Sequence, residues 1–327
     1  MNQLIEYNER PLEMVVDDAN ATSIGNDFIV ANTEIVTLEH LRDDCIVPVF
    51  TKDNEITISH FQFIDEVYNR MRECLGDHKI NSPSVRVSHV IKGRIPSAIG
   101  KSVKELLDHE KTRYYERCAF SIDVPEIYQI IGGNKISLSV GGVRAYNQEN
   151  LYSTKSMEKF KLFIGFKNWV CTNLCINTDG LLDSIKVSSL DELGNRTMEL
   201  IQNFDAEKQL QQMENLTNYS LTEKQFSLLV GKLRMLPFLD KLRFPEVLNC
   251  SLSESQASVI VKDYHVDENF RSDENGNISL WSLYNLMTGA NKSSYIDRNF
   301  QRNANCFELV KHLGKSIETG AKSWYLD

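Results

Sequence analysis

The segment from about residue 114 to residue 178 constrains the fold most, because apolar and polar residues alternate along much of its length. Alternation with a period of two is typical of β-strands that bury one face. The clearest turn is Ile131-Gly-Gly-Asn-Lys135, where Gly and Asn tolerate the positive φ of a tight hairpin. The sequence therefore predicts a β-rich centre, with strands over residues 115–124, 127–131, 135–145 and 159–171.

The pattern changes from strands to helices after residue 187. Capping-box sequences beginning at Ser189, Thr222 and Ser253 each precede an amphipathic run. In such a box the hydroxyl accepts from a free N–H of the first helical turn, while a Glu or Gln three residues later bonds back. Two further apolar helices are expected over residues 280–287 and 296–313, ended by Gly289 and Gly314.

The N-terminal part mixes both patterns. Ser59 opens another capping box, before a helix expected over residues 60–75. Residues 84–89 alternate like a strand. The basic turn Lys92-Gly-Arg-Ile-Pro96 then precedes a helix expected over residues 101–113.

Together these patterns predict an α+β fold, in which a mixed or antiparallel β-rich central core carries a helical C-terminal part. With 327 residues the chain can bury a full core as one large domain or two moderate ones. We expect the helical part to pack on the β-rich part as one unit. The expected regions are a poorly ordered arm over residues 1–25, a mixed part with a β-rich basic centre over 26–187, and a helical part over 188–327.

Charge is distributed unevenly along the chain, whose formal net charge is −9. Residues 81–175 hold 14 Lys/Arg and 8 Asp/Glu, whereas both flanks are acidic. A basic region between acidic flanks indicates a local anion-binding surface. The alternative is a solvated face whose charges are compensated elsewhere in the fold.

The sequence favours a cytoplasmic protein without a membrane partner. No apolar stretch approaches the roughly 20 residues that span a bilayer. The N-terminus lacks the positive region and apolar core of a signal peptide. Seven cysteines without dense spacing fit reduced thiols better than a disulfide framework.

Strong signals for common catalytic sites are missing from the sequence. There is no G-x-x-x-x-G-K-[ST] loop, no G-x-G-x-x-G between a strand and a helix, no metal-site spacing among the seven histidines and no G-x-S-x-G elbow. The sequence therefore predicts no cofactor, no metal and no catalytic residue. Cys171 and Cys175 would share a face in either a helix or a strand, but no nearby His or further Cys joins them. We expect both thiols to be packing residues.

Two polar stretches break the expected pattern of buried and exposed residues. Residues 167–173 place polar side chains in an apolar run, and residues 288–299 crowd hydrogen-bonding groups at a helix–helix junction. The residue types in the second stretch are those that contact phosphate and sugar. The alternative for the second stretch is a polar network that ties two helices together. An enzymatic site would require both stretches to converge in one pocket.

Four segments of the chain resemble a bacterial family of unknown function that occurs in prophage, plasmid and conjugative-transposon contexts. These are residues 86–96, 114–120, 141–180 and 279–299, and the resemblance covers most of residues 27–313. The blocks around VCTNL and LWSLYNLMTG are more distantly similar to the broader phage/plasmid-like protein family. The resemblance implies a mobile-element protein and names no catalytic residue. By association it also implies a role in replication, recombination or defence evasion.

The first functional hypothesis is a non-enzymatic protein that binds nucleic acid, in particular single-stranded DNA, as an accessory factor in replication or recombination. It depends on the basic centre, where aromatic residues are interleaved with Lys and Arg. The residues expected to contact nucleic acid are Arg86, Lys92, Arg94, Arg144, Lys161, Lys167, Asn168, Asn173, Asn291, Lys292, Tyr295 and Arg298.

The second functional hypothesis is an interaction or inhibitor protein that acts on a host protein. The acidic N-terminal 80 residues and the missing catalytic motifs favour it. The sequence leaves the oligomeric state open.

Overall fold

The computed structural model describes residues 27–45, 57–148, 157–239, 247–250 and 252–327. Its centre is a curled antiparallel sheet of seven strands that forms half of a barrel. The strands follow the order β1-β2-β3-β4-β5-β6, and β7 also pairs with β5. Their bounds are β1 Glu34–Ile35, β2 Ser84–Arg94, β3 Lys111–Ile131, β4 Asn134–Ala145, β5 Glu158–Asn168, β6 Leu174–Cys175 and β7 Leu181–Val187.

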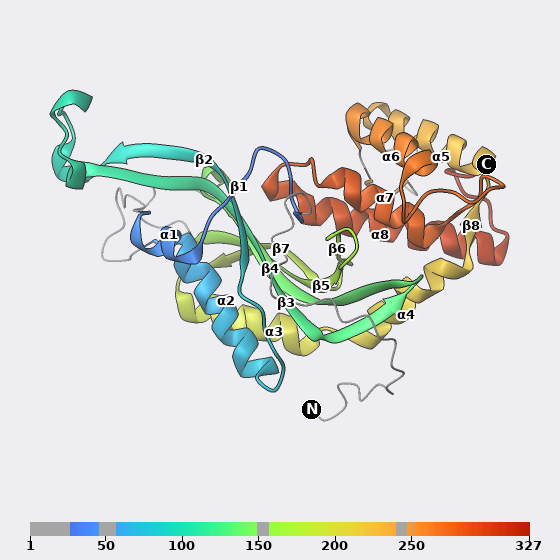
Figure 1. The fold of residues 1–327 in the computed structure, drawn as a ribbon, viewed down its shortest axis with the longest axis horizontal. Coiled ribbons are helices and arrows are strands. Elements are labelled where there is room, and N and C mark those ends of the chain that lie inside the picture. The colour runs from blue at the N-terminus through green and yellow to red at the C-terminus, as the bar shows by residue number, and fades with distance from the viewer. Residues whose placement is uncertain (1–26, 46–56, 149–156, 240–246, 251) are drawn as a thin grey trace.

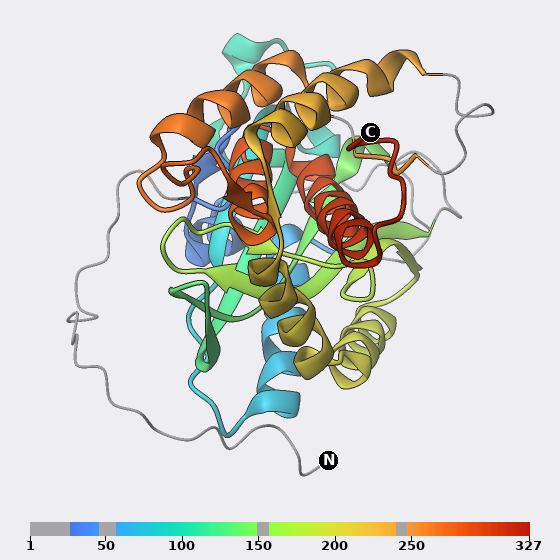
Figure 2. The same cartoon turned by 90° about the vertical axis from the view of Figure 1, so that its right-hand side faces the viewer.

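Helices cover both faces of this sheet. The described residues form α1 Leu38–Asp43, α2 His60–Leu75, α3 Leu190–Asn203, α4 Ala206–Asn215, α5 Glu223–Met235, α6 Glu254–Val266, α7 Leu280–Asn291 and α8 Ile296–Thr319. The sheet lies between α2–α3 on one side and α7–α8 on the other (Figure 1). Helices α5 and α6 lie outside α7, next to the short pair β8 Ser220–Leu221 and β9 Ile278–Ser279. Figure 2 shows this C-terminal helical layer in front of the sheet.

The face of the sheet toward α2 holds the main core. Phe63 of α2 packs edge-on against Phe120 and Phe160, with ring centroids 5.0 and 4.7 Å away. Gly142 of β4 permits this approach, because a Cβ there would lie 2.5 Å from the Phe63 ring. Each such ring contributes about 1.5–3 kcal/mol when it is fully buried. The same cluster of buried side chains continues into α7 and α8.

The structure confirms the predicted α+β class and several of the local predictions. Helix α2 has the expected bounds and a complete capping box. The boxes at Thr222 and Ser253 are also complete, whereas the side chain of Glu192 bonds Ser188 rather than Ser189. Gly132 and Gly133 form the predicted hairpin turn, both with positive φ.

The helix predicted over residues 101–113 is wrong. The start of β3 pairs there with the end of β2, from Lys92 opposite Arg113 to Arg94 opposite Lys111. Three short 3₁₀ turns join the strands, at Pro96–Ala98, Val103–Glu105 and Asp108–Glu110. The ladder supplies hydrogen bonds to this backbone, and the exposed Val103 and Leu107 show that the described part of the chain buries no apolar helical face there. We call residues 92–113 the ribbon arm.

The expected helix ends at Gly289 and Gly314 are also wrong. Helix α7 continues through Gly289 to Asn291, and α8 continues through Gly314 to end at Gly320, which has the positive φ of a C-cap. Burial on nearly all sides of α7 outweighs the low helix propensity of glycine. The predicted arm over residues 1–25 lies outside the described residues. In the described part of the chain, every helix is too short or too polar to cross a bilayer.

Candidate nucleic-acid interface

The second face of the sheet, toward α8, changes character along its length. At one end it is apolar, where Phe163 of β5 packs on Phe300 of α8 with centroids 4.5 Å apart. At the other end, near the β3–β4 hairpin, polar and partly exposed side chains of β3, β4 and β5 replace the apolar ones. We call this part the open end of the sheet.

A hydrogen-bonded group of four side chains marks the beginning of the open end. Lys167 Nζ lies 2.7 Å from Asp123 Oδ2. Ser139 Oγ donates to Asp123 Oδ1 at 2.9 Å, and the Ser121 and Ser139 hydroxyl oxygens are 2.7 Å apart. Both serines are buried, and the carboxylate and the amine keep 10% and 16% of their side chains exposed. The carboxylate thus satisfies the buried serines and neutralises the lysine.

Two exposed aromatic rings and a lysine lie beyond this group. Lys135 Nζ is 4.5 Å from the ring centre of Tyr128 and 5.4 Å from that of Trp169. Tyr128 is 53% exposed and Trp169 is 40% exposed. The indole N–H of Trp169 donates to Ser137 Oγ at 2.8 Å, which fixes the ring on the sheet. We call Tyr128, Lys135 and Trp169 the aromatic platform.

Polar residues of the stretch 167–173 hold a hairpin against α7. Residues 169–173 connect β5 to β6. Asn168 Nδ2 donates to Asn285 Oδ1 at 3.0 Å, and Asn173 Nδ2 donates to the Asn285 carbonyl at 2.8 Å. Asn168, Asn173 and Asn285 are all buried. These buried amides therefore bond to α7 in the core and are not exposed to a ligand.

Lys292, the C-cap of α7, reaches the same hairpin from the other side. Its amine donates to the carbonyl of Cys171 and, at 2.9 Å, to Thr172 Oγ1. Thr172 has a φ of 56°, which is strained for a β-branched residue. The pKa of Lys292 is lowered to about 8, chiefly because the amine is buried; Cys171 and Asp27 oppose this shift, and the nearby Lys167 adds to it.

The two polar stretches therefore converge, as the enzymatic alternative requires, but they bond to each other. Asn291 Nδ2 donates to Asn303 Oδ1 at 3.2 Å, and Asn299 Nδ2 donates to the Asn291 carbonyl at 2.8 Å. This amide network ties α7 to α8, which is the structural alternative for residues 288–299. Within these two stretches, the amide oxygens of Asn173 and Asn291 are buried without a hydrogen-bond partner among the described residues.

Two of the predicted arginines are buried in ion pairs. Arg144 of β4 is fully buried, bonds Glu158 and the Ile58 carbonyl, and stacks on Tyr146 at 4.4 Å. Arg86 of β2 lies 2.8 Å from Asp27 and is 7% exposed. Such pairs fix neighbouring segments and leave little of either guanidinium for a ligand.

The remaining predicted residues lie on the surface in separate places. Lys92 and Arg94 are on the ribbon arm, and Lys161 pairs with Asp183 at 2.7 Å. Tyr295 precedes α8, 58% exposed, with Arg117 5.7 Å from its ring centre, and Arg298 is exposed in the first turn. Of all the predicted contacts, only Lys167 lies beside the aromatic platform.

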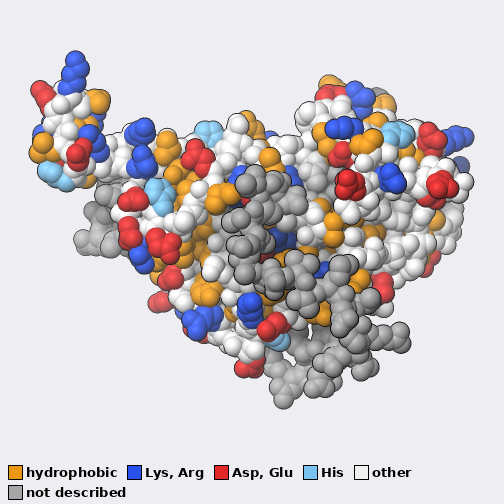
Figure 3. Space-filling view, in the orientation of Figure 1, with side chains coloured by type: hydrophobic (Ala, Val, Ile, Leu, Met, Phe, Trp, Pro, Cys, Tyr) orange, Lys and Arg blue, Asp and Glu red, His pale blue; other side chains and the backbone are white. Residues whose placement is uncertain are grey.

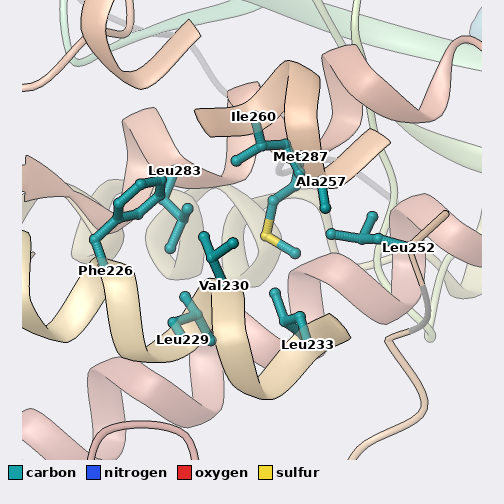
Figure 4. Close-up of a pocket in the computed structure, with 9 residues that line it drawn as sticks. All are labelled: Phe226, Leu229, Val230, Leu233, Leu252, Ala257, Ile260, Leu283 and Met287. Carbon is teal, nitrogen blue, oxygen red and sulfur yellow. The ribbon is translucent and has the colours of Figure 1, made fainter. Parts of the chain in front are cut away.

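Cys171, Cys175 and the cavity between α5, α6 and α7 offer no competing site. Burial raises the pKa of Cys171 to about 11 and that of Cys175 as well, so neither is an activated thiolate. No cluster of three or more metal-ligating side chains occurs among the described residues. A cavity between α5, α6 and α7 is lined only by apolar side chains (Figure 4). It encloses about 10 Å³, which is room for a single water.

Most of the open end is not evident from the sequence. Tyr128 and Lys135 flank the predicted hairpin, but the irregular pairing between Val124 and Tyr128 shifts Tyr128 onto the second face. Ser121, Asp123, Ser137 and Ser139 do give a signal, because polar residues spaced by two within otherwise apolar strands mark one polar face. Which strands bring these residues together is set by the sheet order.

The fold and the open end define an α+β protein with a half-barrel sheet that presents aromatic and basic side chains at one end. A family model described as "Domain of unknown function, B. Theta Gene description (DUF3871)" matches residues 11–326. The chain belongs to this family. No curated protein and no solved structure was found to match it.

Proposed function

We propose that this protein binds single-stranded nucleic acid without catalysing a reaction on it, and that the open end of the sheet is the binding surface. The observation that carries the proposal is the aromatic platform, in which two exposed rings flank a lysine on one sheet face. Unstacked bases bind to aromatic side chains displayed on a sheet, and a nearby cation attracts the backbone.

Single strands fit this surface better than a duplex does. A base can stack on Tyr128 or Trp169 only if its own flat face is free, and paired bases in a duplex are covered by their neighbours. The net charge of −9 means that the protein as a whole repels a polyanion. Nucleic acid is therefore expected to contact only the small surface at the open end. The Lys167–Asp123 pair keeps the carboxylate at the open end neutralised.

Substituting the aromatic rings tests the proposal. Tyr128→Ala and Trp169→Ala are each expected to weaken binding of a labelled oligothymidylate by roughly 5- to 150-fold, since stacking one base is worth about 1–3 kcal/mol. Fluorescence anisotropy at two salt concentrations measures the affinity. Lys135→Gln is expected to reduce the salt slope by about 0.7, the contribution of one phosphate contact on a single strand.

Phe238→Ala is the matched control, because Phe238 is 86% exposed on a short 3₁₀ turn after α5. Its affinity should equal that of the wild type. Tyr128→Ala is the cleaner of the two test variants, because Trp169→Ala also removes the donor to the buried Ser137 hydroxyl. Absence of binding at low salt, or wild-type affinity in both alanine variants, would contradict the proposal.

A protein partner is the second candidate for the same surface. Tyr and Trp are also the residue types that dominate protein–protein hot spots, and Ile130 and Val170 beside them are exposed as well. Recovery of one host protein by this chain after nuclease treatment, lost in Trp169→Ala, would favour an inhibitor or interaction protein. We retain as part of the proposal that the chain is encoded on a mobile element, where replication and recombination expose single strands.

A further inference from the structure

The ribbon arm extends away from the rest of the molecule. The ends of β2 and β3 pass beyond the helical layers, and the three 3₁₀ turns form a separate lobe at the tip (Figures 1 and 3). The arm lies at the beginning of β3, whereas Tyr128 of the aromatic platform lies near its end. The arm is therefore separate from the proposed binding surface at the open end of the sheet.

The tip is ordered by its own contacts. The Ile95 N–H donates to the Glu110 carbonyl at 2.9 Å, and the Leu107 N–H donates to Glu110 Oε2 at 2.9 Å. Lys111 Nζ lies 2.7 Å from Asp108 Oδ1, and Lys101 pairs with Glu110. A lobe held in one conformation before it meets a partner loses little entropy on docking.

This ordered lobe exposes three branched aliphatic side chains. Ile99 is 69% exposed, Val103 is 73% exposed and Leu107 is 55% exposed. Each would gain free energy from burial, and the described residues of the same chain leave it uncovered. Three such side chains on one small lobe, among charged residues, make the tip a candidate interaction site.

The arm also differs in charge from the rest of the molecule. Residues 92–113 contain six Lys/Arg and three Asp/Glu, whereas the whole chain has 36 against 45. Asp108 and Glu110 are neutralised by pairs within the tip. Among the described residues, no carboxylate lies within ion-pair distance of Lys92, Lys104 or Arg113. The arm is thus a positive element on an acidic protein.

We propose that the ribbon arm docks on the acidic body of a second copy of this chain, with the aliphatic tip buried at the contact. Opposite charges on arm and body make two copies complementary to each other. In a two-fold dimer each arm reaches the other body, so every contact is made twice. Burial of the exposed aliphatic side chains at the contact stabilises the dimer. Attraction between the unpaired cations of the arm and the acidic body orients the two copies.

Nucleic acid is a poorer occupant for the arm, although Lys92 and Arg94 were expected to contact it. The tip offers aliphatic side chains, and its one aromatic ring is the small imidazole of His109, whereas the aromatic platform presents a phenol ring and an indole ring. The acidic body would also repel a duplex that lies along the arm.

Sedimentation velocity of the full chain over a wide range of protein concentration tests the proposal. The wild type is expected to form a dimer that weakens as salt is raised. The double variant Ile99→Asp/Val103→Asp is expected to raise the dissociation constant at least tenfold. Lys92→Glu/Lys104→Glu is expected to raise it too and to flatten its salt dependence.

The matched control is Val259→Asp/Val266→Asp, which makes the same chemical change at exposed positions of α6. It should dimerise like the wild type. Neither tip substitution touches the core, so the folded state is expected to survive, as circular dichroism can verify. A wild type that stays monomeric at every concentration, or a dimer that the tip variants leave unchanged, overturns the proposal. Duplex DNA binding by a monomer that depends on the arm also overturns it.

Discussion

Arg144 shows that an arginine expected to bind anions at the surface can instead be a buried member of an ion pair in the core. In the sequence it is one more cation in a basic segment, but in the fold it is fully buried between Glu158, Tyr146 and Phe160. A buried pair of this kind stabilises little in net terms, because desolvation offsets the attraction. Removing one partner is costly, because the other charge stays buried.

Arg144→Met is therefore expected to lower the free energy of unfolding by about 3–5 kcal/mol. Arg144→Met/Glu158→Gln should lose less, because no uncompensated charge remains. Urea denaturation followed by circular dichroism measures both. Lys161→Met is the control, since the Lys161–Asp183 pair is partly exposed and is worth about 0–1 kcal/mol. Equal losses in the single and double variants would argue against this account of the pair.

At the scale of elements, the hairpin between β5 and β6 depends on α7. The strained Thr172 is held in place by the Lys292 amine, and the Asn168 and Asn173 amides bond Asn285. The same contacts position Trp169, which begins the turn. Asn285 and Lys292 thereby support the hairpin that carries Trp169 of the aromatic platform.

This contact predicts a pH dependence of stability. The pKa of Lys292 falls from 10.5 to about 8 on folding, so between these values the unfolded chain binds more protons than the folded one. The free energy of unfolding therefore gains a contribution that rises as the pH rises from about 8 to 10.5. In Lys292→Met this contribution should vanish.

Subtracting the Lys292→Met curve from that of the wild type isolates the lysine. The subtraction is needed because the pKa of Cys171, raised to about 11, gives a contribution of opposite sign above pH 9. Urea denaturation at a series of pH values supplies both curves. A difference that stays flat from pH 8 to 10.5 would show that the amine is charged and solvated in the folded protein.

At the scale of the whole molecule, one cluster of buried side chains connects the sheet to the C-terminal helices. It contains Phe63 of α2, Phe120 of β3, Leu283 of α7 and Leu313 of α8. A core shared in this way couples the two parts, so neither can bury its apolar face alone.

The chain is accordingly expected to unfold in one transition, with near- and far-ultraviolet circular dichroism changing together in urea. The fragments 1–187 and 188–327, cut at the predicted boundary, should each lack a cooperative transition. Mixing them should restore one. Two separated transitions of the intact chain would instead establish two independent domains.

The sequence alone was enough to predict the structural features that depend only on residues close together along the chain. Helix α2, the Gly132-Gly133 turn and the capping boxes at Thr222 and Ser253 follow from local spacing and hydrogen bonding. The same local reasoning failed for residues 101–113, where pairing with the distant β2 outweighed a helical spacing. It also failed at Gly289, where burial of α7 outweighed propensity.

The site depended on the tertiary structure for a physical reason. A Lys, Arg or Asn side chain can contact a ligand only if the fold leaves it exposed. Burial of such a side chain depends on elements that lie far away along the chain. Sequence spacing determined that residues 167–173 and 288–299 are polar where a core would be apolar. Only the sheet order and the docking of α7 decided that these amides are buried and bond to neighbouring elements, while Tyr128 and Trp169 remain exposed beside Lys135 at the open end.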